Sequence, residues 1–286
     1  MTLSMTAFAR SDRETPGGAL AWELRAVNHR YLELSLKLPE ELRSLEPAVR
    51  EAVGKRVARG KLDCTLRFAS VAGAGELKLD AALLRRVMAL SDDVVRAAPA
   101  AAPLRAVDYL RWPGVLATPP LNVEALTQDA LAGLEQALAT LVGMRQREGA
   151  RLHEILSQRL NAVADIVREV KAILPELVPE FRKRLLARLG ELQALDNQRL
   201  EQEVVLYAQR IDVQEEIDRL DTHIAEARDT LRKGGQVGRR LDFLLQEFNR
   251  EANTLASKAS DMRLTKAAVE LKVLIEQMRE QVQNLE

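Results

Sequence analysis

The alternation of hydrophobic and polar positions over the first 80 residues predicts β-strands around one helix. Strand-like runs lie near residues 3–10, 20–37 and 61–71. A Thr-Pro-Gly-Gly turn at residues 15–18 is typical of a hairpin connection between the first two runs. Apolar side chains recur at helical spacing over residues 42–57. The pattern therefore predicts a strand, strand, helix, strand unit.

The middle of the chain predicts short helices separated by proline and glycine. Asp80 precedes a helical pattern and is suited to cap the first turn of that helix. Residues 97–103 form a linker rich in alanine and proline. A short helix is expected to end at residues 112–114, where proline removes a backbone donor and glycine opens the turn.

From about residue 124 onward the periodicity is helical, with helix breakers expected only at Pro175, Pro179 and the glycine loop at residues 234–238. The last helix carries a narrow apolar seam that predicts packing on a helix of the same or another chain. Its members are Leu271, Leu274, Ile275, Met278, Val282 and Leu285.

These elements predict an α+β fold class, with a strand-rich N-terminal domain that has one or two helices, and a C-terminal domain of long helices. The expected boundaries are an N-terminal domain at residues 1–120, a long helical connector at 121–205 and a helical domain at 206–286. A length of 286 residues is sufficient for two domains with cores of their own.

Composition narrows the possible functions. Aromatic residues make up only 3% of the chain, so recognition of single-stranded RNA by stacking on aromatic pairs is not expected. The 42 basic and 42 acidic residues balance, so any nucleic acid must bind through local charge. The single cysteine, Cys64, excludes an intramolecular disulfide framework and a cysteine-rich zinc site, and it is expected to be a buried packing thiol.

The expected location is the cytoplasm, without a membrane partner. The N-terminal residues lack the apolar core of a signal peptide, and no window approaches 18 consecutive apolar residues.

A stripe of polar residues in the predicted helix over residues 211–233 suggests a site. At about 100° per residue, one face of this helix is apolar and forms the expected core. Beside that face, a carboxylate, a guanidinium and an imidazole share a single stripe. Its members are Asp212, Glu216, Arg219 and His223, with Glu215 alongside.

The next predicted helix, residues 239–259, carries two polar stripes opposite its apolar face. One contains Gln246, Arg250, Asn253 and Ser257, and the other contains Glu247, Glu251, Thr254 and Lys258.

Antiparallel packing through the glycine loop would bring Glu216 and His223 near Glu247 and Glu251, and we predict a metal site there. Such a set of oxygen ligands with one nitrogen suits Mn²⁺ or Mg²⁺, and zinc remains open. The alternative is that both stripes are solvated faces stabilised by ordinary acid–base pairs.

A second candidate is basic and lies in the N-terminal half. Residues 50–67 hold six basic residues against Glu51 and Asp63, an excess that can neutralise several phosphates, although a solvated helix end is the alternative. Side chains that can form hydrogen bonds lie before this basic stretch, at residues 25–30. The residues able to contact phosphates, bases or a 2′-OH are Arg25, Asn28, His29, Arg30, Arg59 and Lys61.

Read together, several segments resemble the YicC family along the whole chain. The resemblance rests on residues 4–10, 23–33, 110–116, 145–149, 212–220 with His223, 238–244, 246–254 and 279–284. Departures are mild: Ala7, Ala9 and Ala256 replace a usual glycine, and Arg240 replaces a usual lysine.

The resemblance implies an endoribonuclease that depends on a divalent cation and works as a homo-oligomer, expected to be a hexamer. Glu216, His223, Glu247 and Glu251 are then the expected ligands, with Asp212 and Glu215 as second choices. Arg219 and Arg250 would hold the scissile phosphate. The expected RNA-binding residues are then Arg25, Asn28, His29, Arg30, Arg59, Lys61 and Asn253.

Other mechanisms and functions remain open. His29 or His223 could remove the 2′-OH proton without a metal. The chain could instead be a non-catalytic RNA-binding scaffold, or a phosphohydrolase for small molecules. An RNA-cutting site predicts an open, basic channel, whereas a phosphohydrolase predicts a closed pocket.

Overall fold

The computed structural model describes residues 2–70, 78–117, 122–191 and 197–285, which divide into two compact units. One, the helical unit, comprises Met1–Ala7, Ala26–Tyr31 and Leu141–Glu286. The other, the sheet unit, comprises Phe8–Arg25 and Leu32–Thr140. The two units interleave along the sequence, because short N-terminal segments pack with the C-terminal helices.

The sheet unit is built on a four-stranded sheet in the order β1-β2-β4-β3. Two residues join β1 to β2, as the hairpin turn predicted, whereas a helical crossover lets β3 and β4 pair in parallel. The expected strand over residues 20–37 is in fact two strands. The bounds are β1 Ala7–Thr15, β2 Gly18–Val27, β3 Leu32–Lys37 and β4 Gly60–Ser70.

The first part of a long helix, α4 (Val123–Glu191), packs on the sheet. Buried side chains alternate along β2, and the indole Nε1 of Trp22 donates a 2.8 Å hydrogen bond to the carbonyl oxygen of Ala130. Gly133 permits this approach, since a Cβ there would lie 3.2 Å from the Trp22 ring. Cys64 is buried in β4 and burial raises its pKa to about 12, which confirms a packing thiol.

The predicted helix over residues 42–57 is present as a 3-10 turn, η1 (Glu40–Leu45), followed by α1 (Glu46–Arg56). The carboxylate of Asp80 accepts hydrogen bonds from the backbone nitrogens of Ala82 and Leu83, which confirms that it caps the next helix. The other elements of this region are β5 Lys78–Leu79, α2 Ala81–Ala97, α3 Ala106–Leu110 and β6 Leu116–Ala117.

The prediction of helix breaks at Pro175 and Pro179 was wrong, because α4 continues through both prolines. An internal proline removes one backbone hydrogen bond and strains the preceding turn, at a cost of about 3 kcal/mol. Leu177, between the two, is fully buried, and Leu174 and Val178 pack against the same core. Apolar packing on this stretch opposes the local preference of proline.

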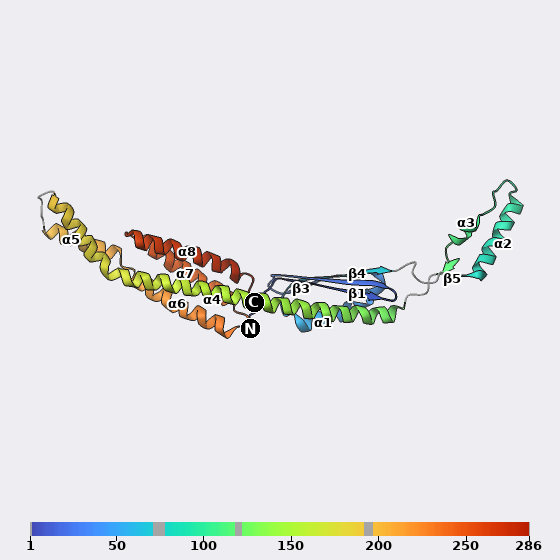
Figure 1. The fold of residues 1–286 in the computed structure, drawn as a ribbon, viewed down its shortest axis with the longest axis horizontal. Coiled ribbons are helices and arrows are strands. Elements are labelled where there is room, and N and C mark those ends of the chain that lie inside the picture. Colours follow the sequence, from blue (N-terminus) through green and yellow to red (C-terminus); the bar gives the residue numbers. More distant parts are fainter. Residues whose placement is uncertain (1, 71–77, 118–121, 192–196, 286) are drawn as a thin grey trace. The chain divides into compact units, whose positions relative to one another are not determined.

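The helical unit surrounds a single apolar core to which α4 and the four following helices contribute. In Figure 1, α6, α7 and α8 lie alongside the second part of α4. The predicted glycine loop separates α6 from α7, and the apolar seam of the last helix is buried in this core. The bounds are α5 Asn197–Arg210, α6 Gln214–Lys233, α7 Gly238–Lys258 and α8 Met262–Val282.

The N-terminal segment forms a junction within the helical unit rather than the strand expected from residue 3. Ser4 bridges to Leu285, and the buried guanidinium of Arg145 donates a 2.6 Å hydrogen bond to the carbonyl oxygen of Ser4. A Cβ at Gly149 would lie 2.2 Å from the backbone oxygen of Thr2, so only glycine fits there.

Among the described residues, no helix combines the length and the apolar character needed to cross a bilayer.

Candidate metal centre

The site is built on the α6–α7 hairpin. Gly234 and Gly235 have φ angles of 67° and 79°, a left-handed conformation that suits glycine, and they turn the chain back on itself. A Cβ at Gly238 would lie 2.3 Å from the backbone oxygen of Leu285, so the start of α7 also requires glycine. In such an antiparallel pair, a residue of one helix lies beside the residue of the other helix that is equally far from the loop.

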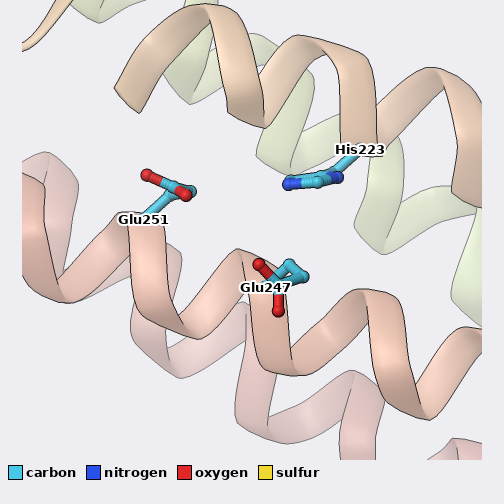
Figure 2. Close-up of side chains that lie close together, drawn as sticks. All are labelled: His223, Glu247 and Glu251. Atoms are coloured by element: carbon cyan, nitrogen blue, oxygen red, sulfur yellow. The ribbon is translucent and has the colours of Figure 1, made fainter. Parts of the chain in front are cut away.

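Three side chains converge between the two helices. One potential ligand atom from each of His223, Glu247 and Glu251 lies within 4.8 Å of the others. Figure 2 shows the imidazole of His223 extending from α6 toward the two carboxylates, which are one turn apart on α7. Glu251 is buried, whereas His223 and Glu247 are half-buried.

Arg219 connects the cluster to the rest of α6. Its guanidinium Nη1 lies 3.5 Å from Oε1 of Glu251, and its Nη2 pairs with Glu215. Attraction to the Glu215 carboxylate, together with the hydrogen bond to Glu251, raises the pKa of the Arg219 guanidinium. Arg219 therefore stays charged beside the cluster.

The predicted fourth ligand, Glu216, lies outside this group. It is buried, and its Oε1 accepts a 2.9 Å hydrogen bond from Nζ of Lys258 at the end of α7. Seven residues separate Glu216 from His223, which corresponds to about 10 Å along the helix axis. Glu216 therefore pairs with the far end of α7.

The remaining C-terminal candidates lie at the surface. Arg250 is exposed, and its Nη1 lies 3.8 Å from Oε2 of Glu247. Asn253 is exposed and its amide donates to Asn249 at 3.3 Å. Of the second choices, Glu215 pairs with Arg219, and the Asp212 carboxylate accepts from the backbone nitrogen of Gln214 at 3.4 Å.

An open groove of about 530 Å³ runs along α6 beside the cluster. It includes three carboxylates and one guanidinium, so it is open, as an RNA site requires, but acidic rather than basic. Its lining residues are Asp212, Gln214, Glu215, Asp218, Arg219, Thr222 and His223.

The N-terminal candidates fall in both units. In the helical unit, the Asn28 side chain donates a 2.6 Å hydrogen bond to the carbonyl oxygen of Gln283, and His29 Nδ1 lies 3.1 Å from the carbonyl oxygen of Tyr31. The guanidinium of Arg30 lies over the Tyr31 ring at 5.2 Å. Asn28 thus makes a contact that stabilises the junction.

In the sheet unit, Arg25 is exposed near the end of β2, and Arg59 is half-buried just before β4. Lys61 on β4 pairs with Glu33 on β3, with 3.7 Å between Nζ and Oε1. The charge of Lys61 is therefore partly offset by a neighbouring strand.

The donor set of the cluster fits a divalent cation. Two carboxylates beside a neutral imidazole carry a charge of −2, and ligands of one ion at about 2.1 Å lie roughly 3 to 4 Å apart. The ligand atoms of the cluster lie within 4.8 Å of one another, a slightly wider spacing than this. Nδ1 of His223 is buried without a hydrogen-bond partner among the described residues, so the ring has capacity that an ion or water could use.

Comparison with known proteins assigns the chain to a family. Residues 2–154 match the family model described as Endoribonuclease YicC-like, N-terminal region, and residues 170–286 match Endoribonuclease YicC-like, C-terminal. The chain belongs to the YicC-like endoribonuclease family.

Full-length relatives in this family carry a matching name. A protein from Haemophilus influenzae, named probable endoribonuclease YicC, is 46% identical over 288 residues. One from Clostridioides difficile with the same name is 30% identical over 297 residues. Each alignment covers 100% of both chains.

The candidate cluster lies wholly within the residues that match the C-terminal family model, and the predicted RNA-binding residues match the N-terminal model, apart from Asn253. The sequence did not reveal the pairing of Glu216 with Lys258. Counting residues would have indicated this pairing, because Glu216 and Lys258 lie at similar sequence separations from the glycine loop.

Proposed function

We propose that this chain hydrolyses internal phosphodiester bonds of RNA with the help of a divalent cation held by His223, Glu247 and Glu251. Membership of the YicC-like endoribonuclease family supports the reaction, and both relatives are named for it. The observation that carries the metal part is the approach of three potential ligand atoms to within 4.8 Å of one another.

The ligand types favour Mn²⁺ or Mg²⁺ as the ion. Carboxylates suit hard cations, and an imidazole nitrogen is better tolerated by Mn²⁺ than by Mg²⁺. When bound, such a cation supplies an activated water and polarises the phosphate.

Side chains around the cluster have separate tasks in this proposal. Glu247 and Glu251 supply negative charge, and His223 supplies a neutral nitrogen from the facing helix. Arg219, about half exposed at the groove, is positioned to contact a phosphate oxygen and stabilise charge that develops on it. Arg250, beside Glu247, can approach the same strand from α7.

The acidic groove supports the need for a cation, because three carboxylates repel RNA phosphates unless positive charge offsets them.

We further propose that Arg25, His29, Arg30, Arg59 and Lys61 hold the RNA backbone. In this proposal the chain forms a homo-oligomer, a hexamer, in which neighbouring subunits contribute these residues as well as the chain that holds the metal.

Surface chemistry supports association with other copies. Helix α2 exposes Met88, Leu90 and Val94, with 46%, 63% and 57% of each residue accessible. Leu90 and Val94 lie one turn apart on the same face of α2, whereas Met88 lies on the opposite side, and neighbouring exposed apolar side chains are typical of an interface. Native mass spectrometry of the wild-type chain measures the oligomeric state.

Cleavage of labelled RNA tests the proposal. Purified protein is incubated with Mn²⁺ or with EDTA, and His223→Gln, Glu247→Gln and Glu251→Gln are compared with Glu276→Gln, which changes an exposed glutamate on α8. We expect cutting with Mn²⁺ only, a loss on the order of 100-fold in the three site variants, and normal cutting by the control.

Several outcomes would contradict this proposal. Equal cutting by all variants points to a contaminating nuclease, and no cutting by the wild type favours a non-catalytic RNA-binding scaffold. Products ending in a 2′,3′-cyclic phosphate, formed equally well in EDTA, favour metal-free removal of the 2′-OH proton by His29 or His223 instead.

A further inference from the structure

A second pocket, of about 270 Å³, lies between α4 and α6. Three cationic side chains line it, Arg168 and Lys171 from α4 and Arg228 from α6, together with the carboxylate of Asp221 and small apolar residues. Among these lining residues there is no aromatic ring on which a base could stack. Its chemistry therefore favours an anion with little apolar surface.

Of the three cations that line this pocket, Arg168 and Lys171 are paired with carboxylates of the described part of the chain, whereas Arg228 is not. Nη2 of Arg228 donates a 2.7 Å hydrogen bond to the side-chain oxygen of Asn161, which is a neutral partner, and within the described ranges no carboxylate forms an ion pair with Arg228. Arg168 pairs with Asp165 at 2.7 Å. The Asn161 contact holds the Arg228 guanidinium in place without offsetting its charge.

Lys171 connects this pocket to the groove beside the candidate metal centre. Its Nζ pairs with Asp221 in the pocket and lies 3.4 Å from Oδ1 of Asp218, which lines the groove. Arg228 lies five residues after His223 on α6, which corresponds to a rise of about 7.5 Å and a rotation of about 140° around the helix. A strand that contacts both places would therefore pass around α6 through the groove that contains Asp218.

We propose that the α4–α6 pocket binds a backbone phosphate of the RNA strand whose scissile bond lies at the His223, Glu247 and Glu251 cluster. This inference rests on the proposed function and adds a site for the part of the substrate that does not react. Contacts to phosphate fix the position of a strand without reading its bases. The pocket thus holds the strand along α6 in a sequence-independent manner.

Binding measurements in EDTA separate this role from cleavage. The probe is a fluorescent single-stranded RNA of 12 nucleotides, titrated with the full-length protein between 50 and 200 mM KCl. Arg228→Gln and Lys171→Gln are compared with Arg228→Lys, which keeps the charge. Asn161→Ala removes the tether of Arg228 but leaves its charge, and Arg96→Gln removes an exposed arginine on α2 that pairs with Asp93.

Loss of one phosphate contact lowers the salt dependence of log K by about 0.7 and weakens binding roughly fivefold to tenfold at 50 mM salt. We expect this result for Arg228→Gln and Lys171→Gln. Arg228→Lys, Asn161→Ala and Arg96→Gln should bind within about twofold of wild type. Thermal melting of each variant confirms that the fold is retained.

The proposal is overturned if Arg228→Gln and Lys171→Gln bind RNA as wild type does, or if Asn161→Ala weakens binding as much as Arg228→Gln, since the loss would then come from helix packing. Displacement of the RNA by inorganic phosphate at an equal concentration of phosphate groups would also overturn it, in favour of a small-anion site.

Cleavage with Mn²⁺ is measured separately. If Arg228→Gln binds RNA normally while the wild type cuts RNA in a metal-dependent manner, the proposal for the pocket fails and the proposed nuclease function stands. Weakened binding by Arg228→Gln without cutting under any condition supports the pocket and contradicts the nuclease function.

Discussion

Glu216 on α6 and Lys258 on α7 form a 2.9 Å ion pair that fixes the relative register of the two helices. The carboxylate of Glu216 is largely buried, whereas the Lys258 side chain is 37% exposed. With this pair at the far end of the hairpin, Arg219 lies opposite Glu251, and His223 opposite Glu247. The pair is thus suited to a structural task beside the candidate metal centre.

Replacing Glu216 by glutamine should lower stability more than activity. The variant loses an ion pair with one buried partner and leaves Lys258 able to reach water, so we expect a loss of about 1 to 2 kcal/mol in the free energy of unfolding. Urea denaturation measures that loss. Cutting of RNA with Mn²⁺ at 25 °C should stay within about threefold of wild type, because Glu216 lies outside the cluster.

Glu251→Gln is the matched comparison, since it also neutralises a buried glutamate on the same hairpin. It should lose cutting on the order of 100-fold. If Glu216→Gln loses cutting to the same extent while it remains folded, Glu216 belongs to the catalytic machinery after all.

The fold was largely predictable because local chemistry determines most of its elements. Asp80 caps α2 as expected, the Pro16-Gly17 turn makes a hairpin, and the glycine loop separates α6 from α7. The three clustered side chains were also predicted together, because helical periodicity and an antiparallel hairpin are sufficient to bring them close. Whether they bind a metal remains a proposal.

Features that depend on distant packing could not be read from the sequence. Pro175 and Pro179 lie within α4 because buried neighbours stabilise that stretch. Ser4 pairs with Leu285 rather than extending β1, a contact across almost the entire chain. Local patterns carry no information on such partners.

Mn²⁺ should raise the thermal stability of the wild-type protein. A ligand that binds only the folded state stabilises it by about 2.7 kcal/mol when present at 100 times its Kd. We expect an upward shift of Tm on titration with Mn²⁺ and none with K⁺ at matched ionic strength. Glu251→Gln and His223→Gln should show a much smaller shift. Identical shifts in wild type and both variants would place the ion elsewhere.

Gly149→Ala should destabilise the junction between the N-terminal segment and α4. Its new Cβ would lie 2.2 Å from the backbone oxygen of Thr2, and backbone cannot move aside as a side chain can. We expect a loss of about 3 kcal/mol. Gly54→Ala is the control, because Gly54 lies in α1 with nothing within 4 Å of the added atom. It should gain up to about 1 kcal/mol from helix propensity, and a stable Gly149→Ala would contradict the close approach.

Asn28→Ala should affect stability rather than RNA affinity. The amide of Asn28 is already engaged with the carbonyl oxygen of Gln283 at 2.6 Å, so its removal should cost about 1 kcal/mol. Chemical denaturation measures this cost, and RNA binding in EDTA should change by less than about twofold. Weaker RNA binding at unchanged stability would restore Asn28 as a contact to the substrate.

Cys64 should link stability to alkaline pH. Burial raises the pKa of its thiol from 9.0 in the unfolded chain to about 12 in the folded one, so the folded state holds its proton more tightly. That contribution is fully present below pH 9 and is lost as the pH rises toward 12, because the unfolded chain releases its proton first. The full difference corresponds to about 4 kcal/mol. Denaturation between pH 8 and 10.5 should therefore show a steeper loss of stability in wild type than in Cys64→Ala, each referred to its own value at pH 8. Equal slopes would mean that the thiol ionises alike in both states.

At pH 8 the thiol of Cys64 in the folded wild type should also resist alkylation by iodoacetamide, and rapid labelling without unfolding would show that the thiol is accessible.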